Sequence, residues 1–311
     1  MKILFATDGS PGSEIALDLL LSLRYRPTDR IDVVSVPVHS YVGASLDGTG
    51  VFISEIIEVE TAAARRTAAE AVARIQARGV TTGVRIVEGP AAEAIIATAV
   101  AAKDGLIVVG SRGRGRIAGA ILGSTARALA RHSPVPVLVV RERREAPMRI
   151  LVASDGSEDS NAAVTALGAL PLPRNADVTV LYVARDAADA NWPPGTFGDE
   201  LRAAVERDER QAALEALRVA AARLPSGVQA HLEIEHGPVA DRVLGHAGAM
   251  GADLIVLGAR GSNLGTLFIQ GSTADRVLAG AHCAVLVARA VDTETIDAVD
   301  SAAPVPAAAM R

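Results

Sequence analysis

The sequence is poor in aromatic residues and carries no excess of positive charge. Its 311 residues include four phenylalanines, three tyrosines and one tryptophan, so aromatic platforms that stack on single-stranded bases are scarce. Thirty-one Lys and Arg residues stand against 36 Asp and Glu residues, which gives a net charge of −5. This balance provides no basic footprint for nucleic acid or for an anionic membrane. We therefore expect neither of them as a partner.

Cysteine, signal sequences and metal motifs are equally scarce. The single cysteine, Cys283, excludes an intramolecular disulfide framework and a cysteine-based metal cluster. The opening MKILFATDGS lacks the apolar core of a signal peptide, and no run of about 18 apolar residues is present for a membrane span. The six histidines form no HExxH pattern, and no GxSxG nucleophile motif precedes a helix. These absences predict a cytoplasmic protein with no metal site and no catalytic residue.

What the sequence does contain is an internal repeat. Half of the residues are apolar, and 311 residues at roughly 150 per domain suggest two domains. KILFATDGS at residues 2–10 returns as RILVASDGS at residues 149–157, and an offset of 148 residues relates VLV at 137–139 to VLV at 285–287. We predict one domain over residues 1–144, a second over residues 148–290, and a disordered tail over residues 291–311.

Short β-branched runs alternate with longer helical patterns in each repeat. In the first repeat the expected strands cover residues 3–6, 31–38, 82–87, 106–109 and 135–140, and the expected helices cover residues 13–23, 58–78, 91–102 and 124–131. Such alternation requires crossover connections, and therefore a mainly parallel sheet with helices on both faces. The predicted fold class is α/β, with two tandem doubly wound, Rossmann-like domains that each contain a five-stranded parallel sheet.

A glycine-rich segment follows the fourth predicted strand of each repeat. GSRGRGRIAGAILGST covers residues 110–125 and GARGSNLGTLFIQGST covers residues 258–273, both with the spacing Gly, two residues, Gly, nine residues, Gly-Ser-Thr. Glycines let the backbone approach phosphate oxygens closely, and the N–H groups at a helix start bind anions. No lysine closes either segment, so neither is a Walker loop. Glycine-rich turns are also common structural loops, but two copies with identical spacing favour a phosphate site.

Side chains within these segments can add to such a site. Arg112 and Arg260 each lie between the first two glycines and can supply positive charge near a polyphosphate. The hydroxyls of Ser124 and Ser272 can either cap the following helix or donate to the same phosphates. Both roles remain open from the residues alone.

An aspartate follows the first predicted strand of each repeat, in Asp8-Gly9-Ser10 and in Asp155-Gly156-Ser157. Ligands bind doubly wound sheets outside the carboxyl ends of the strands, where the strand order reverses. Each aspartate should therefore face a glycine-rich segment, where it can accept hydrogen bonds from a base amine or a ribose hydroxyl. The alternative is that these residues only cap the next helix. We favour that role for the serines and ligand contact for the aspartates.

Together these motifs resemble those of the universal stress protein family, in its nucleotide-binding subclass, and the resemblance covers roughly residues 1–290 as a tandem pair. It implies one ATP per domain, with or without Mg²⁺, and an adenosine beside Asp8 or Asp155. Further implied contacts are the close-approach positions Ala6 and Ala153, and the adenine-contacting positions Val38 and Val183. Ribose and phosphates would be held by Gly110, Ser111, Arg112, Gly113, Gly123, Ser124 and Thr125, and by Gly258, Ala259, Arg260, Gly261, Gly271, Ser272 and Thr273.

The resemblance also implies how the chain assembles and what it does. The last strand of such a domain is commonly a pairing edge, so the two halves should pair with each other, and a homodimer is a further expectation. The expected function is nucleotide-dependent regulation in a stress response, with weak hydrolysis at most. The alternatives are a slow ATPase or self-phosphorylating enzyme that uses Asp8 or Asp155 to hold magnesium, and a scaffold that binds no nucleotide.

Overall fold

A computed structural model of the chain describes residues 1–37, 50–113, 122–142, 148–173, 175–184, 196–225, 227–228, 230–261 and 272–290. The tail predicted over residues 291–311 lies outside these described residues, as do Val38 and Gly271. None of the helices in the described part of the chain combines the length and the apolar composition that crossing a membrane requires.

The two halves repeat the same order of strands and helices. The first half contains β1 (Lys2–Ala6), α1 (Pro11–Ser22), β2 (Arg30–Ser35), α2 (Gly50–Gln76), β3 (Thr81–Ile86), α3 (Ala91–Ala102), β4 (Leu106–Gly110), α4 (Ser124–His132) and β5 (Val137–Val140). The second half contains β6 (Arg149–Ala153), α5 (Glu158–Ala169), β7 (Asp177–Ala184), α6 (Thr196–Ala222), β8 (Ala230–His236), α7 (Val239–Met250), β9 (Leu254–Gly258), α8 (Ser272–Gly280) and β10 (Ala284–Ala288).

Two element boundaries in the first half differ from the sequence prediction by three residues or more. β2 ends at Ser35 rather than at Val38, because Pro37 has no N–H to donate and cannot continue a hydrogen-bonded strand. α2 begins at Gly50 rather than at residue 58, since the apolar, β-branched residues that precede its alanine-rich part join the helix despite their lower helix propensity. Ile56, in this extension, is exposed to solvent, as is Val59 just after it.

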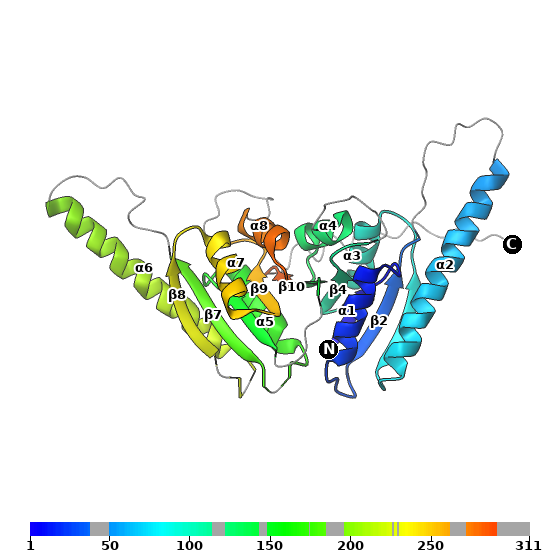
Figure 1. Ribbon diagram of the computed structural model, residues 1–311, viewed down its shortest axis with the longest axis horizontal. Coiled ribbons are helices and arrows are strands. Elements are labelled where there is room, and N and C mark those ends of the chain that lie inside the picture. Colours follow the sequence, from blue (N-terminus) through cyan, green and yellow to red (C-terminus); the bar gives the residue numbers. More distant parts are fainter. Residues whose placement is uncertain are drawn as a thin grey trace.

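The ten strands in the described part of the chain form one continuous sheet, in the order β3-β2-β1-β4-β5-β10-β9-β6-β7-β8. Each half contributes five strands that run parallel to one another, which confirms the predicted doubly wound units. β5 and β10 pair antiparallel, with Leu138 opposite Leu286, so the halves pair through their last strands as expected. The long helices α2 and α6 consequently stand at opposite ends of the molecule (Figure 1).

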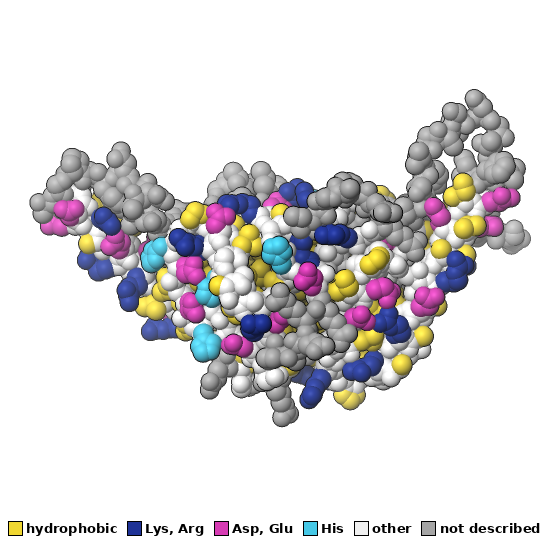
Figure 2. Space-filling model, in the orientation of Figure 1, with side chains coloured by type: hydrophobic (Ala, Val, Ile, Leu, Met, Phe, Trp, Pro, Cys, Tyr) yellow, Lys and Arg dark blue, Asp and Glu magenta, His cyan; other side chains and the backbone are white. Residues whose placement is uncertain are grey.

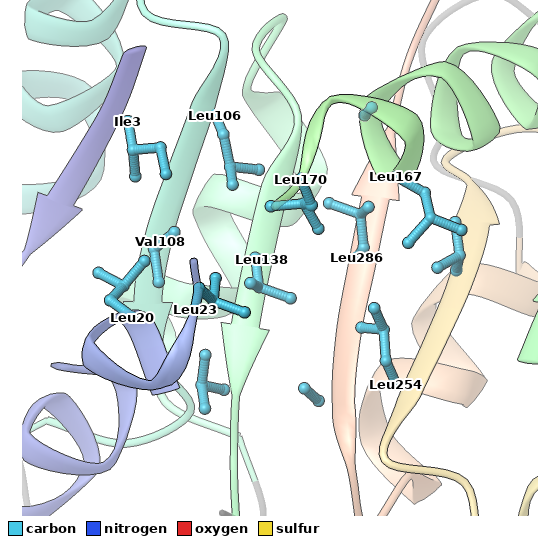
Figure 3. Close-up of a cluster of buried hydrophobic side chains, with 14 of the residues drawn as sticks. Ile3, Leu20, Leu23, Leu106, Val108, Leu138, Leu167, Leu170, Leu254 and Leu286 are labelled. Carbon is cyan, nitrogen blue, oxygen red and sulfur yellow. The ribbon is translucent and has the colours of Figure 1, made fainter. Parts of the chain in front are cut away.

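Hydrophobic cores cover both faces of this sheet. Helices α1, α2, α5 and α6 pack on one face, and α3, α4, α7 and α8 pack on the other. The first of these clusters is continuous across the two halves, because Leu138 of β5 and Leu286 of β10 are paired across the antiparallel contact and belong to it together with Leu23 and Leu170 (Figure 3). The halves therefore share a core in addition to strand hydrogen bonds.

Two equivalent arginines also form hydrogen bonds between the halves. Arg141, after β5, donates a hydrogen bond to the backbone carbonyl of Leu278 in the second half. Arg289, after β10, donates one to the backbone carbonyl of Arg131 in the first half. Burial lowers the pKa of both guanidinium groups, because a charge is costly to remove from water. Elsewhere on the surface, Lys and Arg side chains are interspersed with Asp and Glu over the face in view (Figure 2).

Candidate functional site

A cavity of about 540 Å³ opens at the carboxyl ends of β1 and β4, the two adjacent strands at which the strand order reverses. This is the position at which doubly wound sheets bind ligands. The site residues predicted for the first half that line it are Ala6, Asp8, Gly110, Ser111, Arg112, Gly113, Gly123, Ser124 and Thr125. Local sequence and strand order together therefore bring two segments about 100 residues apart to one cavity.

The β1–α1 loop fixes the direction of Asp8. Gly9 takes a φ of 72°, a left-handed conformation that glycine adopts at little cost. Ser10 then caps α1, since its side chain accepts a hydrogen bond from the N–H of Ser13. The N–H of Ser10 donates to Oδ1 of Asp8 at 3.0 Å, which orients the carboxylate. The predicted capping role of this serine is confirmed.

The other oxygen of Asp8 faces the glycine-rich segment. A Cβ placed on Gly113 would lie only 2.6 Å from Oδ2 of Asp8, so the carboxylate and the loop backbone meet as the sequence predicted. Gly110 has a different constraint, because a Cβ there would lie 2.3 Å from the backbone carbon of Gly12. Gly110 thus lets the loop after β4 pack directly against the start of α1.

The start of α4 supplies the N–H groups of the site. Gly123 is the N-cap residue of α4, and it makes no side-chain capping hydrogen bond. The N–H groups of the first helical turn therefore point out of the helix without a side-chain acceptor from this cap. Such a helix end attracts negative charge through its N–H groups and its dipole.

An equivalent but smaller cavity, about 310 Å³, opens at the carboxyl ends of β6 and β9. The predicted residues that line it are Ala153, Asp155, Val183, Gly258, Ala259, Arg260, Gly261 and Thr273. Ser272 begins α8, whereas Gly271 lies outside the described residues.

The loop after β6 copies the geometry of the first half. Gly156 has a φ of 77°, and Ser157 caps α5 by accepting from the N–H of Ser160. The N–H of Ser157 donates to Oδ1 of Asp155 at 3.1 Å. A Cβ on Gly261 would lie 2.9 Å from Oδ2 of the same aspartate. The second cavity therefore has the same carboxylate facing the same kind of loop.

Larger side chains at three positions accompany the smaller volume of the second cavity. Leu181, Tyr182 and Val239 line it at the positions that Val34, Ser35 and Ala91 occupy in the first half. Each of these replacements adds side-chain volume at the end of the cavity formed by the second strand and the third helix of the half. The two cavities therefore differ in the size of the side chains at that end.

The adenine-contacting positions predicted for the two halves are not equivalent. The N–H of Thr7 donates to the carbonyl of Val34, and the N–H of Ser154, which follows β6 as Thr7 follows β1, donates to the carbonyl of Leu181. This register aligns Val183 with Val36, two residues before Val38. Val36 lines the first cavity, whereas Val38 lies outside the described residues. The predicted pairing of Val38 with Val183 is therefore displaced by two residues from the register of the strands.

Sequence reasoning missed one acidic residue in each cavity. Glu60 of α2 lines the first cavity and Glu209 of α6 lines the second. Each glutamate stands four residues before a buried alanine, Ala64 or Ala213, which places it on the helix face that meets the sheet. That shared spacing is the signal that could have identified them.

The structure also brings together three potential metal ligands that the sequence did not suggest. Ligand atoms of Glu233, Glu235 and His246 lie within 4.8 Å of one another, and Nδ1 of His246 lies 2.7 Å from Oε1 of Glu235. The first half carries Arg85 and Thr98 at the positions of Glu233 and His246. The cluster is therefore specific to the second half and is not part of the repeated site.

Comparisons with known proteins give a consistent result. The model of the universal stress protein family matches residues 1–141 and again residues 147–289. A universal stress protein of Mycolicibacterium smegmatis is 27% identical over 301 residues, covering 92% of this chain and 96% of its own length. Universal stress protein YxiE of Bacillus subtilis is 32% identical over 148 residues, covering 45% of this chain and 98% of its own length. The crystal structure of a universal stress protein from Archaeoglobus fulgidus aligns with a TM-score of 0.59 at 21% identity, over 93% of this chain and 98% of that one, which shows a common fold.

Proposed function

The chain belongs to the universal stress protein family, and from this premise we propose that each half binds one adenine nucleotide, ATP in particular, and that the bound nucleotide regulates the protein in a stress response. The observation that carries the proposal is the first cavity, in which the N-terminus of α4 and the glycine-rich segment lie opposite Asp8. Such a cavity combines a helix end that attracts anions with a carboxylate that accepts hydrogen bonds.

The parts of the cavity suit different parts of the nucleotide. The phosphates would lie against Gly113, Gly123 and the start of α4, where the backbone N–H groups and the helix dipole favour negative charge. Asp8 would accept hydrogen bonds from the adenosine. The base would lie at the end of β2, beside Val36, where the cavity wall is apolar. Asp155, Val183 and Gly261 would have the same roles in the second half.

A divalent cation that accompanies the triphosphate would need oxygen ligands. Among the residues that the structure describes, the carboxylates that line the first cavity are Asp8 and Glu60, and those that line the second are Asp155 and Glu209. Carboxylates suit Mg²⁺, which commonly binds through one or two of them together with substrate phosphates. These residues would hold the ion, whose charge would offset repulsion between the phosphates and the carboxylates.

Chemistry on the bound nucleotide is expected to be slow. The protein has two lysines, Lys2 and Lys103, and neither lines either cavity among the described residues. A regulator needs only that binding stabilises one state of the protein, by an amount that grows with ligand concentration and reaches about 2.7 kcal/mol at 100 times Kd.

The test combines thermal unfolding with analysis of nucleotide in the purified full chain. ATP should raise the Tm in a concentration-dependent manner, and the double variant Gly113→Glu with Gly261→Glu should lose this rise because each new carboxylate occupies the phosphate end of a cavity. Gly248→Glu is the matched control, since a Cβ added to this exposed helical glycine would meet no atom within 4 Å. A wild-type Tm that does not respond to ATP would contradict the proposal. Rapid phosphate release, lost in Asp8→Ala with Asp155→Ala while ATP still binds, would instead establish an enzyme.

A further inference from the structure

The two cavities have different residues at one pair of equivalent positions beside the glycine-rich segments. Gly12 lies in the first turn of α1, and the corresponding residue of α5 is Asp159. A Cβ on Gly12 would lie 2.3 Å from the carbonyl oxygen of Arg112, so the first half has no room for a side chain there. The second half accommodates a buried carboxylate at the same place, with 4% of Asp159 exposed.

Asp159 holds the arginine of the second glycine-rich segment. Its Oδ2 accepts hydrogen bonds from the backbone N–H of Arg260 at 3.0 Å and from Nε at 2.9 Å, and its Oδ1 accepts one from Nη2 at 3.1 Å. Oδ1 also accepts from the N–H of Ala290 at 2.8 Å. A two-pronged contact between guanidinium and carboxylate is among the stronger interactions in proteins. Arg260 lines the second cavity whereas Asp159 does not, so this contact pairs the guanidinium charge of Arg260 with a carboxylate outside the cavity lining.

Arg112 has no such restraint. It lines the first cavity and is exposed, and Gly12 offers it no carboxylate. Among the residues that the structure describes, no acidic side chain forms a salt bridge with it. Its nearby positive charge adds to the effect of burial in lowering the pKa of Arg141, while Cys283 opposes that effect. An anion is therefore the partner that Arg112 is suited to take.

We propose that Asp159 makes the two nucleotide sites unequal: the first site uses Arg112 to select nucleotides with a β- and γ-phosphate, whereas the second site binds adenine nucleotides with little regard to phosphate number. The inference rests on the proposed function and adds to it the ligand preference of each site. A contact between Arg112 and a terminal phosphate should favour ATP over AMP by about tenfold, as a charge-assisted hydrogen bond does.

The experiment needs each site by itself in the full chain. Gly261→Glu leaves the first site as the only one, and Gly113→Glu leaves the second, because each new carboxylate blocks one phosphate end. Titration calorimetry then measures the Kd of ATP and of AMP in both proteins. In each protein, the ratio of the ATP affinity to the AMP affinity cancels the contribution of the base and ribose, which both ligands share. Comparing this ratio between the two sites then cancels much of the contribution of the helix N-terminus, which both sites share. We expect the ATP-to-AMP affinity ratio to be about tenfold larger in the first site.

Three further substitutions assign the difference to individual residues. Arg112→Gln should lower the ratio of the first site about tenfold, whereas the equivalent Arg260→Gln should change the ratio of the second site by less than about twofold. Asp159→Asn keeps the shape of the side chain but removes its charge, so it should release Arg260 and raise the ratio of the second site. Circular dichroism tests whether each variant is folded. If Asp159→Asn is unfolded, the affinity ratios of the two arginine variants still test the proposal.

The outcomes separate this inference from the function on which it rests. If Arg260→Gln lowered the preference for ATP as much as Arg112→Gln does, both arginines would contact phosphates. That result would overturn this inference but not the proposed function. A folded Asp159→Asn variant with an unchanged ratio would overturn it as well. Failure of the wild-type chain to bind any adenine nucleotide would overturn the proposed function and, with it, the preference of both sites.

Discussion

Leu286 lies at the contact between the two halves, and its replacement by alanine tests whether they unfold as one unit. The side chain is fully buried, and it pairs across the antiparallel β5–β10 contact with Leu138, which is 2% exposed. Leu286→Ala removes three buried carbon atoms, which at about 0.8 kcal/mol each costs about 2.4 kcal/mol before the cavity that remains is counted. With that cavity, the free energy of unfolding should fall by about 3 to 4 kcal/mol.

Equilibrium urea unfolding measures this loss, and hydrogen exchange shows where it occurs. Because the hydrophobic cluster around Leu286 is continuous across both halves, protection of backbone amides should fall in β1 and β4 of the first half as well as in β9. Leu214→Ala is the control, since this leucine of α6 is 41% exposed, and its loss should cost less than about 1 kcal/mol. A loss of protection confined to the second half, or a change in stability no larger than that of the control, would refute the shared core.

Two further changes test the local geometry. Asp104 is buried, and its pKa is raised first by burial and then by the charge of Asp32, so its ionised form destabilises the fold at pH values above the raised pKa. Asp104→Asn should therefore raise the Tm at pH 7 and lose this advantage at about pH 3, where the carboxyl is protonated in both the folded and the unfolded state. An equal gain in Tm at both pH values would contradict this cause. Gly110→Ala should lower the free energy of unfolding by about 1 to 3 kcal/mol, because the new methyl group would lie 2.3 Å from the backbone of Gly12. Urea unfolding measures that loss, and a stability equal to that of the wild type would show that the loop can move aside.

Much of the fold could be predicted from local patterns in the sequence. The alternation of β-branched runs with alanine-rich helical segments indicated a parallel sheet, and α3 has the predicted bounds, Ala91–Ala102, because Pro90 precedes it and Lys103 ends it in a left-handed conformation. The end of β2 was harder to predict, since the apolar residues up to Val38 suit a strand and only the missing N–H of Pro37 prevents one. The start of α2 was also missed because its first residues have weak helix propensity.

Some residues of the candidate site could be predicted from the sequence and others could not. The repeated spacing of the glycines and aspartates was enough to place Asp8 opposite Gly113 and Asp155 opposite Gly261, since these motifs follow adjacent parallel strands. Glu60 and Glu209 were missed, because one charged residue on a long helix looks like any other until the orientation of that helix over the sheet is known.

The sequence alone determined that the chain consists of two copies of one α/β unit, since the repeat, the hydrophobic periodicity and the turn residues are local properties. Only the tertiary structure decided how the copies differ. The carboxylate of Asp159 reaches Arg260 across 101 positions of the chain, and the volumes of the two cavities depend on side chains from separate strands and helices. Such contacts depend on which segments the sheet brings together and on which atoms then lie within hydrogen-bonding distance. For this reason two segments with the same spacing of glycines can place their arginines differently.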